Sequence, residues 1–304
     1  AVGYIRANPR ATLGLTAIVV VITRIITLVT QAGPLAAIDR LAAAPSSYQL
    51  SNRDMAVVSM SFTAGAIVTS LATIVLVGML TVVVGRAVFG SSITVGEAWA
   101  MVRGRFLALI GLAALVGLGA AMPIGLVVLL VVAAATAANA AAAAVIGIPL
   151  ILALVALLAY LYIVVSFAAT VIVLERLPVF AAISRSFFLI RNSFWRVLGI
   201  LLLTSLITYL VTGAVALPFN LAGKVLGGGV GSLATVSPAS VLSEVGMAIG
   251  QIIVLPFTAG VVVLLYTDRR IRAEAFDLVL RTGAAGGPLA TGSTDSLWLT
   301  RPPV

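Results

Sequence analysis

Long apolar stretches alternate with short polar ones along this chain, and this alternation sets its predicted architecture. A helix needs about 20 apolar residues to cross a bilayer, and six stretches reach that length. The polar stretches between them are too short to build a water-soluble module. The sequence therefore predicts six transmembrane helices, at Leu13–Ala32, Met55–Gly85, Phe106–Val132, Val145–Leu174, Val197–Leu217 and Val245–Tyr266.

The composition supports an integral membrane protein and excludes several classes of site. The 304 residues are 62% hydrophobic and 9% charged, whereas about a quarter of a soluble globular chain is charged. The chain contains neither Cys nor His, which rules out disulfides, thiolate nucleophiles and histidine chemistry. The few carboxylates form no paired or metal-ligating pattern. We therefore predict no catalytic residue, metal or cofactor, and an enzyme is the least supported class.

The net charge of +9 follows the predicted topology. Nucleic-acid binding would require a basic face on a soluble module, so we expect no nucleic-acid partner. Thirteen basic residues fall in the termini and connections on one side of the membrane, against three on the other side. The positive-inside rule then places both termini in the cytoplasm. Seventeen Arg and one Lys, in a chain rich in Ala, Val and Gly, suggest a bacterial protein of the inner (plasma) membrane.

The starts of the first, third and fifth spans share a pattern. Arg6, Arg103 and Arg191 are each followed three residues later by Pro or Phe, and eight residues later by Gly. One interpretation is an internal repeat of three tandem helical hairpins at about 4–90, 91–177 and 178–281, which form one membrane domain over 1–281 before a flexible cytoplasmic tail at 282–304. The alternative is that any cytoplasmic helix start carries Arg and an interfacial aromatic residue.

Amphipathic segments beside these starts predict interfacial helices on the cytoplasmic side. Three segments show this pattern, namely Ser92–Phe106, Pro178–Arg196 and Thr267–Arg281. In the second, Phe180, Ile183, Phe187, Ile190 and Phe194 form the apolar stripe. Such helices either anchor the hairpins or contact anionic headgroups and partners. The candidate contact residues are Trp99, Arg103, Arg105, Arg185, Arg191, Trp195 and Arg196.

Three segments of the chain carry a family resemblance. Residues 4–14, 186–199 and 266–280 resemble the bacterial glycerophosphoryl diester phosphodiesterase membrane-domain family, and the likeness extends over about residues 4–281. The resemblance implies a polytopic membrane protein. In the name-giving proteins the enzyme activity belongs to a separate soluble domain, which this sequence does not show, so the resemblance does not imply a phosphodiesterase. Members of the family often carry a Pro/Gly-rich N-terminal extension, and the start at Ala1 suggests that the given chain lacks one.

Arg24 is the most informative polar residue because it lies inside a predicted span. It follows Leu13 by about 16 Å of helix, near the middle of the membrane. An Arg there costs about 2.5–3.5 kcal/mol on insertion scales, so it should face a polar partner or water. Either it binds an anionic ligand in a cavity, or it clamps helices together. The candidate partners are Gln251, Glu244 and Asp54.

Small residues in the spans predict close helix packing. Gly246 and Gly250 form a GxxxG pattern in the sixth span, and the third span contains Gly111, Gly117, Gly119 and Gly125.

Taken together, the sequence favours a non-catalytic scaffold or lipid-contacting subunit that acts with a membrane-protein partner or as a homo-oligomer. The alternative is a transporter or pore for a lipidic or anionic solute, with Arg24 in its pathway.

Overall fold

The computed structural model describes residues 10–43, 52–88, 94–137, 139–226, 238–274 and 298. Every regular element within these residues is helical, and six helices are long and apolar enough to cross a membrane, which confirms the predicted all-α membrane architecture. The elements in chain order are a π-helical turn, η1 (Arg10–Gly14), then α2 (Leu15–Ala43), α3 (Asn52–Val88), α4 (Val95–Arg103), α5 (Phe106–Ala137), α6 (Ala140–Val165), α7 (Ala168–Leu174), α8 (Val179–Ile190), α9 (Phe194–Leu226) and α10 (Pro238–Glu274).

In three places the helices differ in extent from the predicted segments, although the apolar spans themselves lie where the sequence predicts them. Helix α2 continues eleven residues beyond Ala32, because the following Leu- and Ala-rich residues favour helix. Helix α10 runs without a break to Glu274, so the described part of the third predicted interfacial segment continues the sixth span. The fourth predicted span is divided between α6 and α7. There the Ser166 hydroxyl donates to the Ile163 carbonyl at 2.7 Å, which competes with the backbone ladder and favours a turn.

Five described helices contain proline without ending at it, and one of them is α2, which contains Pro34. Pro123, Pro149, Pro218 and Pro256 lie inside α5, α6, α9 and α10, and none of these helices stops there. The structure therefore gives no broken helix of the kind that forms substrate sites in transporters at these four positions.

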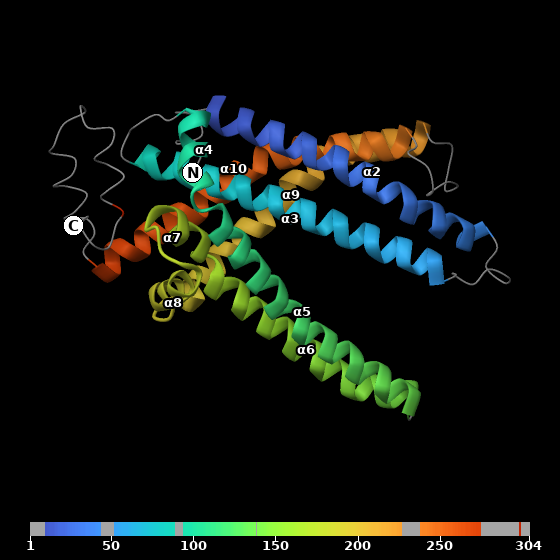
Figure 1. The fold of residues 1–304 in the computed structure, drawn as a ribbon. Helices are drawn as coiled ribbons and strands as arrows, with labels where there is room; N and C mark the ends of the chain where they lie inside the picture. Colours follow the sequence, from blue (N-terminus) through green and yellow to red (C-terminus); the bar gives the residue numbers. More distant parts are fainter. Residues whose placement is uncertain are drawn as a thin grey trace. The chain divides into compact units, whose positions relative to one another are not determined.

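The chain divides into two compact units, each built from two separate segments (Figure 1). Unit 1 consists of Ala1–Ala100 and Leu201–Val261, and unit 2 consists of Met101–Ile200 and Val262–Val304. This division crosses the boundaries of the three predicted hairpins, and the internal repeat stays a prediction. Because α9 and α10 each contribute to both units, neither unit is a continuous stretch of sequence.

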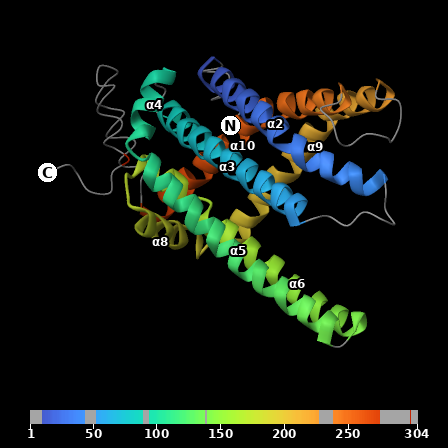
Figure 2. The ribbon, with the colours of Figure 1, turned by 45° about the vertical axis from the view of Figure 1, so that its right-hand side comes forward.

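In unit 1, α2 and α3 pack side by side, as Figure 2 shows. The predicted GxxxG pair brings α10 close to α9: a Cβ built on Gly246 would lie 2.8 Å from Phe219 Cβ, and one on Gly250 would lie 2.9 Å from Thr212 Cγ2. These distances leave no room for a larger residue, so the packing interpretation of this pair is confirmed. Helix α4 starts with a capping box in which Thr94 and Glu97 bond each other's backbone N–H.

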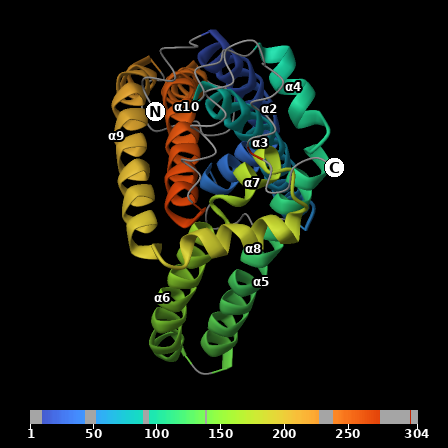
Figure 3. The ribbon, with the colours of Figure 1, turned by 90° about the vertical axis from the view of Figure 1, so that its left-hand side faces the viewer.

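In unit 2, α5 and α6 form a long antiparallel pair and α8 crosses their ends (Figure 3). Helix α8 buries Ala182, Ser186, Leu189 and Ile190, and the Ser186 hydroxyl donates to the Val164 carbonyl near the end of α6. Phe180 and Phe187, on the predicted apolar stripe, are instead exposed at 77% and 43%. Unit 2 therefore covers the stripe unevenly, since Ile190 is buried and Ile183 and Phe194 are intermediate.

Candidate functional site

Arg24 forms an ionic cluster with α10 inside unit 1. Its Nη1 donates to Glu244 Oε2 at 3.0 Å, and its Nε donates to Gln251 Oε1 at 3.3 Å. The side chains of Arg24 and Glu244 are 20% and 26% exposed. Two of the three partners proposed from the sequence thus contact Arg24, whereas the side chain of the third, Asp54, lies outside the described residues. We call Arg24, Glu244 and Gln251 the Arg24 cluster.

The spacing of residues on α10 explains how one guanidinium reaches two partners. Glu244 and Gln251 are seven residues apart, which is about two helical turns or 10.5 Å of rise on one helix face. Ala248 lies between them on the same face and is buried. A small side chain at this position leaves room for the guanidinium to reach both neighbours.

A pocket of about 240 Å³ lies beside the Arg24 cluster, between α2 and α10. Apart from Arg24 and Glu244, its lining is entirely apolar, and it is partly open. Several lining side chains are also well exposed, including Ile25 at 57%, Val245 at 43% and Ile249 at 38%. In a bilayer such a rim faces hydrocarbon, and the pocket surface is wholly apolar, because Arg24 and Glu244 line it with their carbon atoms only.

The residues proposed for interfacial contact fall into two groups. Most of them reach the surface of the described structure: Trp195 is 80% exposed, Trp99 is 45% exposed, and Arg191 lies 4.8 Å from the Phe188 ring centroid. Arg103 and Arg196 are exposed and Arg105 is intermediate. These side chains remain available for headgroups or partners, whereas Arg185 does not share this environment.

Arg185 belongs to a second ionic cluster, in unit 2, which the sequence interpretation missed. Its Nε lies 3.3 Å from the Oε2 of Glu175, whose side chain is fully buried. The hydroxyl of Tyr266 also donates to Glu175, and Arg270 Nη1 approaches the same carboxylate at 3.9 Å. Arg270 Nη1 further donates to the Tyr266 hydroxyl at 3.3 Å. We call Glu175, Arg185, Tyr266 and Arg270 the Glu175 cluster.

A strained turn directs Glu175 inward. Glu175 is the C-cap of α7, and Arg176 follows with a φ of 58°, a left-handed conformation that glycine normally supplies. Helix α7 ends at this reversal, and the Glu175 carboxylate contacts Arg185 of α8 and Tyr266 of α10. The only signal for this buried carboxylate in the sequence was its place directly after a predicted span, followed by Arg, Leu and Pro. A hydropathy pattern does not register this signal.

The C-terminal segment contributes one described residue to unit 2. Trp298 is 2% exposed, its ring centroid lies 6.2 Å from that of Tyr266, and its carbonyl accepts from Arg270 Nη1 at 2.9 Å. In the structure, Trp298 packs against its own chain.

Comparisons with protein families, with curated proteins and with solved structures found no match to this chain.

Proposed function

We propose that this chain is a non-catalytic scaffold subunit of the bacterial inner membrane, with both termini in the cytoplasm. In this proposal it contacts lipids, including anionic headgroups through its interfacial Arg and Trp residues, and associates with a membrane partner or a second copy through the α5/α6 pair. The charge asymmetry of the connections and the resemblance to the phosphodiesterase membrane-domain family support the placement and the polytopic class. The association surface rests on the structure of unit 2.

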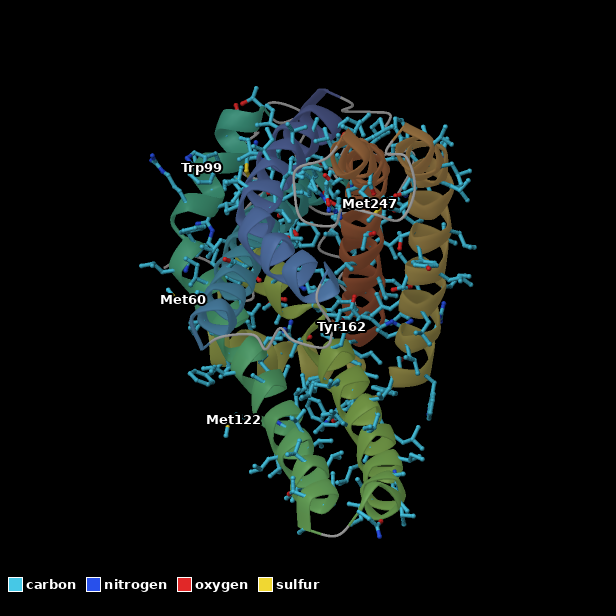
Figure 4. The ribbon with its side chains drawn as sticks, turned by 90° about the vertical axis from the view of Figure 1, so that its right-hand side faces the viewer. Met60, Trp99, Met122, Tyr162 and Met247 are labelled. Carbon is cyan, nitrogen blue, oxygen red and sulfur yellow. The ribbon has the colours of Figure 1, made fainter. Side chains whose placement is uncertain are left out.

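The observation that carries the proposal is the exposure of α5 and α6. From Ala113 to Ala137 no residue of α5 is buried, and between 141 and 162 Gly147 is the only buried residue of α6 whose burial the structure describes. Leu118 and Met122 are exposed at 62% and 76%, and Met122 points away from the helix pair in Figure 4. Most of this pair contacts only itself within unit 2, so its outer surface is available to lipid or protein.

Small residues on α5 favour protein over lipid on part of this surface. Gly117, Ala121 and Gly125 recur every four residues and are all exposed. A Cβ added at Gly117 or Gly125 would meet no atom within 4 Å. The intramolecular packing predicted for these glycines is therefore absent from the described structure. Such stripes let another helix approach closely in a membrane, where apolar burial alone gives no drive to associate.

The transporter alternative has weaker support. A pathway for an anionic solute would need polar groups around Arg24, but the adjoining pocket is apolar except for Arg24 and Glu244. The charge of Arg24 is already paired with a carboxylate at 3.0 Å. These contacts favour a structural or lipid-binding role for Arg24 over ion conduction.

Cross-linking in native membranes tests the proposed association. Because the chain has no cysteine, Ala121→Cys adds a single thiol on the small-residue stripe, and Leu126→Cys adds one off the stripe at a position that is 57% exposed. We expect oxidation to cross-link the Ala121→Cys protein to a second copy or to a membrane partner, and the Leu126→Cys protein much less. Adding Gly125→Leu should abolish the adduct. Equal cross-linking at both positions, or none at Ala121→Cys, would contradict the proposal.

A further inference from the structure

One side of α8 carries aromatic side chains that the described residues leave uncovered. This outer face of α8 consists of Phe180, Ser184, Phe187, Phe188 and Arg191, which fall within about 100° of one another at 3.6 residues per turn. All five are exposed, and the three Phe side chains are 77%, 43% and 46% exposed. The buried residues of α8 lie on the opposite side of the helix. Several large apolar side chains gathered on one exposed face indicate a contact with something outside the chain.

Helix α8 lies between the ends of two candidate membrane spans. The apolar stretches on either side of it are Ala143–Leu174 and Phe194–Gly223. Its 12 residues rise about 18 Å, which is too short to cross a hydrocarbon layer about 30 Å thick. A helix in such a connection lies near the membrane surface, where aromatic side chains reach the acyl chains and Arg reaches the headgroup phosphates. Trp195, in the first turn of α9, is also exposed, at 80%.

The charges in this part of the chain match an anionic surface. Between residues 101 and 200 there are six arginines and one carboxylate, and this carboxylate, Glu175, is buried and paired with Arg185. Arg191 and Arg196 are exposed. The guanidinium carbon of Arg191 lies over the Phe188 ring, 4.8 Å from its centroid. This cation–π contact keeps the charge beside the aromatic side chains of the outer face and does not neutralise it, so the guanidinium can still donate to a phosphate.

The same charges disfavour a second copy of the chain as the occupant of this face. In a symmetric contact through α8, Arg191 and Arg196 of one copy would approach the same residues of the other, and like charges repel. The one carboxylate between residues 101 and 200 is buried and does not offset them. An anionic phospholipid supplies acyl chains for the Phe side chains and a phosphate for the arginines.

We propose that the outer face of α8 binds the surface of an anionic phospholipid leaflet. Phe180, Phe187 and Phe188 insert among the acyl chains, and Arg191 and Arg196 bind headgroup phosphates. This inference rests on the proposed membrane placement of the chain, and it assigns the headgroup contact to one helix and to lipids of one charge. It does not depend on association through the α5/α6 pair.

Spin-label measurements on the full chain test whether lipid covers this face. Because the chain has no cysteine, Ser184→Cys allows one nitroxide to be attached on the outer face, and Asn192→Cys allows one in the exposed turn after α8. In liposomes that contain phosphatidylglycerol, we expect the label at 184 to collide mainly with oxygen dissolved in the bilayer, and the label at 192 mainly with a water-soluble nickel chelate. Equal access of the chelate to both labels would mean that the face points into water. Exclusion of both reagents from the label at 184 would mean that protein covers the face, and either result would overturn the inference.

Lipid retention by the purified full chain tests the role of the charge. The chain is incubated in detergent micelles with phosphatidylglycerol or with zwitterionic phosphatidylcholine, and bound lipid is measured by native mass spectrometry. We expect Arg191→Gln to reduce retained phosphatidylglycerol about fivefold, and Arg191→Gln combined with Arg196→Gln about twentyfold, while retained phosphatidylcholine stays within about twofold. The control, Arg272→Gln, removes the same charge from an exposed guanidinium that pairs with Asp268 at 2.9 Å, and it should leave both lipids within about twofold.

Three outcomes of the retention experiment would overturn the inference. They are equal retention of the two lipids by the original protein, no loss in the Arg191→Gln variant, and equal losses in the Arg191→Gln and Arg272→Gln variants. Cross-linking at Ala121→Cys reports on the α5/α6 pair and not on α8. The proposed association and this inference therefore fail separately.

Discussion

The two ionic clusters of this chain contain the same kinds of side chain but differ in how completely they are satisfied. In the Glu175 cluster, one buried carboxylate faces the hydroxyl of Tyr266 and the guanidinium groups of Arg185 and Arg270. In the Arg24 cluster, one guanidinium has two described partners and stands beside a 240 Å³ pocket. The first arrangement is buried and joins α7, α8 and α10, whereas the second is partly exposed and joins α2 to α10.

The burial of a charge and the number of its partners indicate its role better than its position within a predicted span does. A buried charge surrounded by its own partners ties elements together, and removing one partner leaves the others uncompensated. A partly exposed ion pair needs less compensation when one partner is removed. We therefore expect substitutions in the Glu175 cluster to lower stability more than substitutions in the Arg24 cluster.

Glu175→Gln should have the largest effect on stability. It removes the negative charge that faces Arg270, whose side chain is 4% exposed, and we expect the free energy of unfolding to fall by about 3–5 kcal/mol. Denaturant titration of the protein in detergent measures this change. The matched control is Glu97→Gln, at a carboxylate that is 56% exposed, which should cost about 1 kcal/mol or less. Similar losses of stability for both variants would show that the Glu175 cluster contributes no more than an exposed ion pair.

A double-mutant cycle at the Arg24 cluster should show strong coupling. Arg24→Leu and Glu244→Leu each leave one charge without its partner, and we expect each to lower the free energy of unfolding by about 2 kcal/mol. The double variant should be about as stable as the original protein, because an apolar pair needs no compensation. Additive losses would show that the two side chains are not coupled.

Tyr266→Phe should have a smaller effect than Glu175→Gln. It removes one hydroxyl donor from the buried carboxylate and leaves both guanidinium groups in place, so we expect a loss of about 1–2 kcal/mol. Tyr162→Phe, at a side chain that is 60% exposed, is the control and should stay within about 0.5 kcal/mol. The same titration measures both. If Tyr266→Phe lowers the free energy of unfolding as much as Glu175→Gln does, the hydroxyl and not the charge makes the main contribution of the Glu175 cluster to stability.

Arg176→Gly should stabilise the protein slightly. Arg176 is exposed and has a φ of 58°, which glycine adopts without a Cβ penalty, so we expect a gain of up to about 1 kcal/mol. Arg176→Ala, which keeps the Cβ, should give no such gain. If Arg176→Gly destabilises the protein instead, the Arg side chain has a role in directing Glu175 that the described contacts do not explain.

Sequence reasoning found the Arg24 cluster because a bilayer offers few polar partners. An Arg inside a span must find a partner, and the other spans contain few residues that qualify, so Glu244 and Gln251 could be named in advance. The same reasoning missed Glu175. Its burial depends on the turn at Arg176 and on side chains from α8 and α10, which are distant in sequence. Likewise, the hydropathy pattern shows no interruption at Ser166. There α6 ends, and the Ser166 hydroxyl donates to the Ile163 carbonyl.

The sequence separation within the Arg24 cluster also affects how the chain is made. Glu244 follows Arg24 by 220 residues. At about 5–20 residues per second of synthesis, the first span waits roughly 10–40 s for this partner. During that interval the membrane must hold an arginine without its carboxylate, at the insertion cost of about 2.5–3.5 kcal/mol. The apolar residues of the first helix must therefore supply all of the free energy for its insertion. Helix α10 stabilises the inserted helix later, when Glu244 pairs with Arg24.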